Sequence, residues 1–136
     1  MAVAAALAAI ILLWPSGETA DCRTVRVSDG DTAIIDCPGW PEWAFRLHGA
    51  DAPETREGLV ALNAKLAFEA LLSTPRLFAV VTQVRDAWGR PVVRLMRPDG
   101  SDLTCELIRQ GHAIEDLRFS RGAYAACAPP RPEPRP

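Results

Sequence analysis

Five charged residues in this chain are of the types that metal-assisted attack on a phosphodiester requires. Asp31 follows an Asp-Gly turn, and Asp51 and Glu54 flank an Ala-Pro pair five residues after Arg46. Arg90 ends a later turn, which can bring a second guanidinium to the same place. Asp31 opens one expected strand and Arg46 lies near the end of its neighbour, so we expect the carboxylates and guanidinium groups to meet. The combination predicts hydrolysis of a phosphate ester with the help of a divalent cation.

Each of the five residues has a distinct expected role. Asp31 and Asp51 supply carboxylates that repel each other unless a cation lies between them. Glu54 would orient or deprotonate a water molecule, and Arg46 and Arg90 would neutralise charge that builds on the phosphoryl oxygens. A purely structural role stays open for each motif alone: the Asp-Gly pair is a hairpin signal, and the segment from Asp51 to Glu54 can be a turn before a helix.

The strands that position these residues follow from alternation and turn signals. Runs of β-prone residues bounded by Gly, Asp and Pro predict two hairpins and one further strand. Within residues 43–48 the alternation turns Arg46 away from the apolar face, and His48 is expected to be a partly buried strand residue. The strands are expected at residues 23–28, 32–37, 43–48, 77–84 and 91–96.

Two helices complete the expected order of elements. Residues 59–72 read as an amphipathic helix whose apolar stripe is Leu59, Leu62, Leu66 and Ala70. Thr104 is the expected N-cap of a shorter helix over residues 105–110, which Gly111 ends. The fold class is therefore α+β, mainly β: a five-stranded Greek-key OB-fold barrel with a helix after the third strand and a short C-terminal helix.

The N-terminal segment is apolar from residue 2 to residue 14. As a helix this segment spans only about 20 Å, less than a bilayer core, so residues 1–20 read as a signal peptide with cleavage after Ala20. No basic residue precedes the apolar run and Glu18 lies close to the cut, so an uncleaved membrane tether through residues 1–14 stays open. We expect a secreted or periplasmic protein, with a membrane-anchored form outside the cytoplasm as the alternative.

The four cysteines all follow the export segment, and their even number favours two disulfides. Cys22 and Cys37 bracket the first hairpin, so their pairing would tie its open ends together. Cys105 would then pair with Cys127, although three connectivities are formally possible. Residues 21–127 are expected to form one domain, and residues 128–136 a Pro-rich disordered tail.

The net charge of -2 argues against a broad electrostatic clamp on duplex DNA. A compact active site needs no such basic face. We expect a monomer that acts on single-stranded or locally open DNA or RNA.

Taken together, the motifs resemble those of the staphylococcal nuclease-like (thermonuclease) family. The matching stretches are VSDGDT at 27–32, FRL at 45–47, DAPE at 51–54, Asp86 with Gly89-Arg90, and ELIRQGHA at 106–113, spread over residues 23–119. The resemblance implies an OB-fold barrel and calcium-dependent hydrolysis of DNA and RNA that leaves 3′-phosphates. It implies Ca²⁺ bound by Asp31, Asp51 and the carbonyl of Ala52, phosphate bound by Arg46 and Arg90, and water activated or positioned by Glu54.

The chain departs from the family pattern near its C-terminus. A long C-terminal helix is not evident, and the tyrosines that support the substrate in the family are replaced here by Leu117 and Phe119, which leaves Tyr124 as the candidate for that role. The alternative function is a non-catalytic OB-fold module that binds nucleic acid or a protein partner. All five candidate side chains are present, which favours the enzyme.

Overall fold

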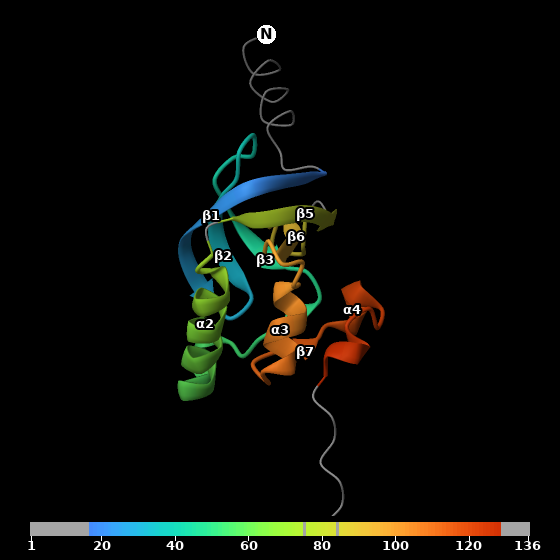
Figure 1. Cartoon of the computed structure of the whole chain (residues 1–136). Coiled ribbons are helices and arrows are strands. Elements are labelled where there is room, and N and C mark those ends of the chain that lie inside the picture. Colours follow the sequence, from blue (N-terminus) through green and yellow to red (C-terminus); the bar gives the residue numbers. More distant parts are fainter. Residues whose placement is uncertain (1–16, 75, 84, 129–136) are drawn as a thin grey trace, which may run out of the picture.

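The computed structural model describes residues 17–74, 76–83 and 85–128 (Figure 1). Most of the predicted export segment and nearly all of the predicted Pro-rich tail lie outside the described residues, so both remain predictions. Among the residues described, no helix has both the length and the apolar character needed to cross a membrane.

Five strands close into a mixed barrel in the order β1-β2-β3-β6-β5, which confirms the predicted fold class. Only β3 and β6 run parallel; the other neighbours in the barrel are antiparallel. The barrel strands are β1 (Glu18–Asp29), β2 (Thr32–Asp36), β3 (Trp43–Leu47), β5 (Leu77–Gln83) and β6 (Val92–Met96). Their inward side chains form the core, which includes Ile35, Phe45, Leu47, Leu77 and Leu95.

The first strand is longer than predicted. It begins at Glu18 rather than at residue 23, because its first residues pair with β5 before the strand turns to pair with β2. Glu18 pairs with Val80 and Thr19 with Ala79, and these contacts close the barrel. Polar residues at the start of the strand hide it from a search for apolar alternation.

Helix α2 (Leu59–Leu72) has the predicted bounds, but the predicted apolar stripe is not its buried face. Leu59, Leu62 and Leu66 are each about half exposed or more, whereas the helix buries Ala61, Ala64, Phe68, Leu71 and Leu72. Small alanines face inward because the helix approaches the backbone of the β1–β2 turn closely. Leucine spacing alone therefore indicated the helix correctly and its orientation wrongly.

Helix α3 (Leu103–Arg109) begins earlier than predicted, and its N-cap is Asp102 rather than Thr104. The Asp102 carboxylate accepts hydrogen bonds from the backbone N–H groups of Thr104 and Cys105. Thr104 lies inside the helix, where its hydroxyl donates to the carbonyl of His48 at 2.7 Å. The Asp102 carboxylate, two residues earlier, is thus the acceptor for the free N–H groups of the first turn.

Outside the barrel the chain forms a set of short elements, of which Figure 1 labels β7 and α4. The two-residue strand β4 (Ala50–Asp51) pairs with β7 (Ile114–Glu115) outside the barrel. The other elements are the 3₁₀ turns η1 (Thr55–Glu57) and η2 (Ala125–Cys127) and the single-turn helix α4 (Leu117–Ser120). No long C-terminal helix is present within the described residues.

Both predicted disulfides are present. Cys22 bonds to Cys37 and Cys105 bonds to Cys127, with Cα–Cα separations of 4.2 Å and 5.2 Å. The first joins the open ends of the β1–β2 hairpin, and the second fastens the C-terminal segment to α3. Two structural disulfides indicate a protein of an oxidising compartment, outside the cytoplasm.

Candidate active site

The β1–β2 turn brings Asp31 against segments far away in the sequence. A Cβ atom added at Gly30 would lie 2.7 Å from the Cβ of Ala52 and 2.8 Å from that of Ala64. Only glycine therefore lets the turn sit between α2 and the segment after β4. The Asp29 carboxylate accepts a hydrogen bond from the backbone N–H of Asp31 at 3.1 Å, which fixes the turn itself.

Asp31 is a buried carboxylate, with the residue only 5% exposed. Its Oδ1 accepts from the hydroxyl of Thr32 at 3.0 Å, and its Oδ2 accepts from the backbone N–H of Ala52 at 3.1 Å. Arg46 Nη1 lies 3.5 Å from the same Oδ2. Burial, together with the neighbouring Asp29 carboxylate, raises the pKa of Asp31 to about 6 in spite of the guanidinium. The two hydrogen bonds use only part of the acceptor capacity of a carboxylate, which is about four sites.

Arg46 extends from β3 away from the barrel core, as the alternation predicted. Its side chain is 16% exposed, its Nη2 donates to the carbonyl of Ala50 at 3.1 Å, and the same Nη2 lies 3.7 Å from Asp116 Oδ2. The guanidinium therefore stands between two buried carboxylates, Asp31 and Asp116. Because the hydrogen bond to Ala50 also fixes it to β4, Arg46 is held in place before any ligand binds.

Arg90 is held by the turn that precedes it. Asp86 Oδ1 accepts from the backbone N–H groups of Trp88 and Arg90, each at 2.9 Å, and Asp86 Oδ2 accepts from Arg90 Nε at 2.8 Å. Burial acts to raise the pKa of Asp86, but these N–H donors outweigh it and the pKa is lowered. Arg90 Nη1 donates to the Thr32 hydroxyl at 3.0 Å. One hydroxyl thus links Arg90 to Asp31.

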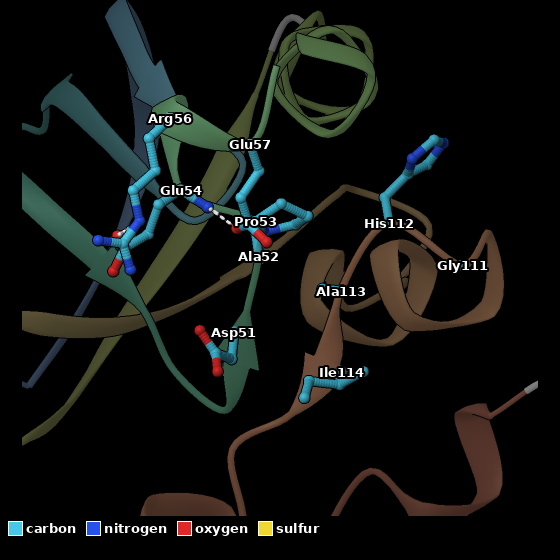
Figure 2. A pocket seen from close by; sticks show the side chains of 10 residues that line it. All are labelled: Asp51, Ala52, Pro53, Glu54, Arg56, Glu57, Gly111, His112, Ala113 and Ile114. Atoms are coloured by element: carbon cyan, nitrogen blue, oxygen red, sulfur yellow. Dashed lines mark hydrogen bonds and ion pairs between the residues drawn. The ribbon is translucent and has the colours of Figure 1, made fainter. Parts of the chain in front are cut away.

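The remaining predicted residues lie next to this network. Asp51 is exposed on β4, directly before the Ala52 N–H that binds Asp31. Glu54 is largely exposed: its backbone N–H donates to Glu57 Oε2 at 2.5 Å, and its own carboxylate pairs with Arg56 at 3.1 Å. Figure 2 shows Glu54 turned toward Arg56. The structure therefore links Asp31 to Arg46, to the Ala52 backbone and, through Thr32, to Arg90, whereas the Glu54 carboxylate pairs with Arg56.

A hollow of about 400 Å³ lies beside these residues, between the segments 51–57 and 111–114 (Figure 2). Asp51 and Glu54 line it, whereas Asp31, Arg46 and Arg90 do not. The hollow thus borders the site at Asp51 rather than enclosing it.

Asp116 and Arg118 lie at the site, and neither was predicted from the sequence. Asp116 is buried and accepts from Arg118 Nε at 3.0 Å and from Arg118 Nη2 at 2.8 Å. The hydrogen bonds and charge of Arg118 lower the pKa of Asp116, and the charge of Arg46 lowers it further. The only signal in the sequence is the Asp-x-Arg spacing, which is too common to point to a site.

Tyr124, the candidate for the role of the substrate tyrosines, is buried and hydrogen-bonded to other protein groups. It is 5% exposed, and its hydroxyl lies 3.3 Å from His48 Nδ1 and donates to Asp102 Oδ2 at 3.3 Å. Burial and the Asp102 charge raise the pKa of Tyr124 to about 12, and burial lowers the pKa of His48. His48 is partly buried, as expected, and both residues belong to a structural network that holds the C-terminal segment.

Acidic side chains at the candidate site form only a small donor set. Across residues 17–74, 76–83 and 85–128, no group of three or more His, Cys, Asp or Glu side chains is placed to hold a metal ion. A cation bound at Asp31 would therefore depend on two carboxylates, backbone carbonyl oxygen and water.

No protein-family model matches the chain, and no curated protein sequence is significantly similar to it. The five-stranded mixed barrel is consistent with OB-fold families. The likeness to the staphylococcal nuclease-like family therefore remains one of motifs and fold.

Proposed function

We propose that this chain is a calcium-dependent nuclease that hydrolyses phosphodiester bonds of DNA, RNA or both. The observation that carries the proposal is the Thr32 hydroxyl, which donates to Asp31 and accepts from Arg90. It unites a candidate metal carboxylate and a candidate phosphate-binding guanidinium from distant parts of the chain. Arg46 Nη1 lies 3.5 Å from the other oxygen of the same carboxylate, so one guanidinium is next to Asp31 directly and a second is linked to it through Thr32.

The oxygen donors at the site suit a hard cation. Ca²⁺ prefers carboxylate, carbonyl and water oxygens, and Asp31, Asp51 and the Ala52 carbonyl would hold it, with water as the remaining ligands. A buried carboxylate whose pKa is raised to about 6 is under-compensated by its protein neighbours, which is the state that a bound cation relieves. When bound, the ion would supply positive charge at the phosphate and a fixed orientation for it.

The protein's own side chains would carry the rest of the reaction. Arg46 and Arg90 are oriented by Asp31, Asp116 and Asp86 and would bind the non-bridging oxygens, with tighter contact as negative charge builds on them. Because hydrogen bonds already hold both guanidinium groups, little reorganisation is needed when the phosphate arrives. By resemblance to the staphylococcal nuclease-like family, the 5′-oxygen would leave and the phosphate would remain on the 3′ side.

Glu54 would accept the proton of the attacking water. In the structure its carboxylate pairs with Arg56, and the Glu54 side chain is 69% exposed. An exposed pair of this kind contributes little to stability, so the carboxylate can leave Arg56 at low cost and turn toward the site. The proposal therefore includes a rearrangement of residues 54–57 when the substrate binds.

The two disulfides support a secreted or periplasmic setting, with a membrane-anchored form outside the cytoplasm as the alternative. The open surface beside Asp51 suits a single-stranded or locally open nucleic acid, and we propose that the protein acts as a monomer.

A non-catalytic OB-fold module that binds nucleic acid or a protein partner is the second candidate. The pairing of Glu54 with Arg56, away from Asp31, favours it. In that case the arginines would bind phosphate without hydrolysis.

A calcium titration on the full chain separates the two functions. The protein is incubated with fluorescently labelled single-stranded DNA in buffered calcium and in excess EGTA. The enzyme predicts cleavage that rises with calcium and stops with the chelator, and fragments that carry 3′-phosphates. Binding without cleavage at any calcium concentration would favour the non-catalytic binding module. Equal cleavage in both buffers would show that the cleavage does not depend on calcium.

Glu54→Gln in the same assay tests the proton acceptor. Loss of a general base slows a reaction by roughly a hundredfold or more, and Glu57→Gln provides a neighbouring control. A Glu54→Gln rate equal to the wild-type rate would show that Glu54 does not handle the water.

A further inference from the structure

Arg118 is a third guanidinium at the candidate site, and the proposed reaction does not use it. It lies in α4, and its side chain is 75% exposed. Two of the five N–H groups of an arginine side chain are used here by the hydrogen bonds to Asp116 Oδ1 and Oδ2, at 3.0 Å and 2.8 Å. Asp116 thus holds one edge of the guanidinium, the Phe119 ring lies 5.3 Å from its central carbon, and the rest of the group is open to solvent.

Asp116 places Arg118 beside Arg46. The Asp116 carboxylate is 4% exposed, and its Oδ2 lies 3.7 Å from Arg46 Nη2 and 2.8 Å from Arg118 Nη2. A single buried oxygen therefore lies between two cations, one inside the site and one at its rim. The Asp116 backbone N–H donates to the Gly49 carbonyl at 2.8 Å, and the Asp116 side chain caps α4, so the carboxylate itself is firmly fixed.

Arg118 is also close enough to Asp51 for the two charges to interact. Its pKa is raised by the hydrogen bonds and charge of Asp116 and, to a smaller extent, by the charge of Asp51. Asp51 follows Ala50, whose carbonyl holds Arg46, and precedes Ala52, whose N–H holds Asp31. Arg118, Arg46 and Asp51 therefore border the same stretch of surface.

Neighbouring phosphates of a nucleic-acid strand present a row of negative charges at short intervals, and arginine binds each through its fork of N–H groups. We propose that Arg118 binds the phosphate next to the one held by Arg46, with Asp116 as the positioning residue for both guanidinium groups. This inference rests on the proposed action on nucleic acid. It assigns a strand-binding role to the segment in which the family's tyrosines are missing.

The test measures how salt weakens the binding of a single strand. A labelled oligothymidylate is titrated with the full chain in EGTA, so that it is not cleaved, at several concentrations of NaCl. Each phosphate contact on a single strand contributes about 0.7 to the slope of log affinity against log salt. We expect Arg118→Gln to lower the slope by about 0.7 and to weaken binding several-fold at low salt. In calcium, KM should rise while kcat changes little.

Arg23→Gln is the matched control. Arg23 is also exposed and paired with an aspartate, Asp36 at 3.2 Å, but it lies at the open end of the β1–β2 hairpin, away from the turn that holds Asp31. Arg23→Gln removes the same net charge as Arg118→Gln. Because Arg23 lies away from the site, the salt slope of Arg23→Gln should equal that of the wild type. Arg118→Lys keeps the charge but lacks the fork of N–H groups, so it should restore only part of the slope.

The outcomes separate the two proposals. An Arg118→Gln slope equal to the slopes of the wild type and of Arg23→Gln would overturn the strand-binding role, even if calcium-dependent cleavage is found. The protein could instead bind the strand with a slope that depends on Arg118 but never cleave it. That result would support the strand-binding role and overturn the proposed nuclease activity. Failure of the wild-type chain to bind the oligonucleotide would overturn the strand-binding role directly.

Discussion

Two polar clusters of similar composition lie on this barrel, and they differ in how completely their members compensate one another. We name them the Asp31 cluster and the Tyr124 cluster. The Asp31 cluster contains Asp31, Thr32, Arg46, Arg90 and Asp116. The Tyr124 cluster contains His48, Arg94, Asp102, Thr104 and Tyr124.

In the Tyr124 cluster the groups satisfy one another. Asp102 accepts from Arg94 Nε and Nη2 at 3.2 Å and 3.1 Å and from the Tyr124 hydroxyl, and it caps α3 as well. In the Asp31 cluster, by contrast, a buried carboxylate keeps a pKa raised to about 6 beside an exposed Asp51. The two clusters are thus built from similar residue types, and the feature that distinguishes the Asp31 cluster as the candidate site is its buried carboxylate with a raised pKa next to solvent.

Loss of the Tyr124 side chain should have the largest effect, and the quantity it lowers is stability. Tyr124→Ala removes a buried aromatic side chain and should lower the free energy of unfolding by about 3 to 5 kcal/mol, measured by urea denaturation. Tyr124→Phe, which removes only the hydroxyl, should cost about 1 kcal/mol. Turnover per folded molecule should stay near the wild-type value in both, and a loss of turnover in Tyr124→Phe would mean that this cluster takes part in the reaction.

Substitution of Arg90, in the Asp31 cluster, should lower activity rather than stability. Arg90→Ala removes a donor aimed at the phosphate and should lower kcat/KM by about a hundredfold. Stability should change little, because the backbone N–H groups of Trp88 and residue 90 still bind Asp86. Arg90→Lys keeps the charge without the fork and should recover only part of the rate. A rate loss explained entirely by unfolding, measured by circular dichroism, would contradict this role.

Two glycine variants test whether the Asp31 cluster and the Tyr124 cluster have different roles. Gly30→Ala would place a Cβ atom 2.7 Å from Ala52, and Gly49→Ala would place one 2.4 Å from the Tyr124 ring. Each should lower the free energy of unfolding by up to about 3 kcal/mol through overpacking. Gly30→Ala should lower turnover per folded molecule more than Gly49→Ala, because it pushes Asp31 itself away from the Ala52 N–H, whereas Gly49 reaches the Asp31 cluster only through the hydrogen bond from the Asp116 N–H to its carbonyl. Equal turnover losses in the two variants would remove the distinction between the clusters.

A smaller effect is the pH dependence of stability without calcium. The folded-state pKa of Asp31, about 6, lies above its ordinary value of 3.8, so the folded protein binds more protons between these pH values. The contribution of Asp31 to stability is therefore complete below about pH 4 and is lost as the pH rises through 6, on the order of 3 kcal/mol. Asp31→Asn should remove this decline from denaturation curves in EGTA, and an unchanged decline would assign it to another group.

Much of the fold could be predicted from the sequence because its signals are local. The Asp-Gly turn before Asp31, the cysteines around the first hairpin and the leucine spacing of residues 59–72 each reflect contacts within a short stretch of chain. The inward face of α2 could not be predicted, because it depends on how closely the turn at Gly30 approaches Ala64.

The candidate site was predictable only in part, for the same reason. Arg46 and Arg90 stand next to turn and strand signals, so their direction followed from alternation and from the Asp86 turn. Asp116 acts on Arg46 from 70 positions further along the chain. Such a contact leaves no periodic trace, and neither does the pairing of Glu54 with Arg56.

The first residues of β1 bear on how the protein leaves the cell interior. Gly17 accepts from the Val81 N–H, and Glu18 and Thr19 pair with β5, so these residues form part of the seam of the barrel. A peptidase cut after Ala20 would remove most of that seam and leave Cys22 opposite Leu77 as the remaining pair of the β1–β5 register. Cleavage further upstream, or no cleavage, would keep the β1–β5 pairing that closes the barrel. The predicted cleavage site after Ala20 thus lies within the residues that close the barrel.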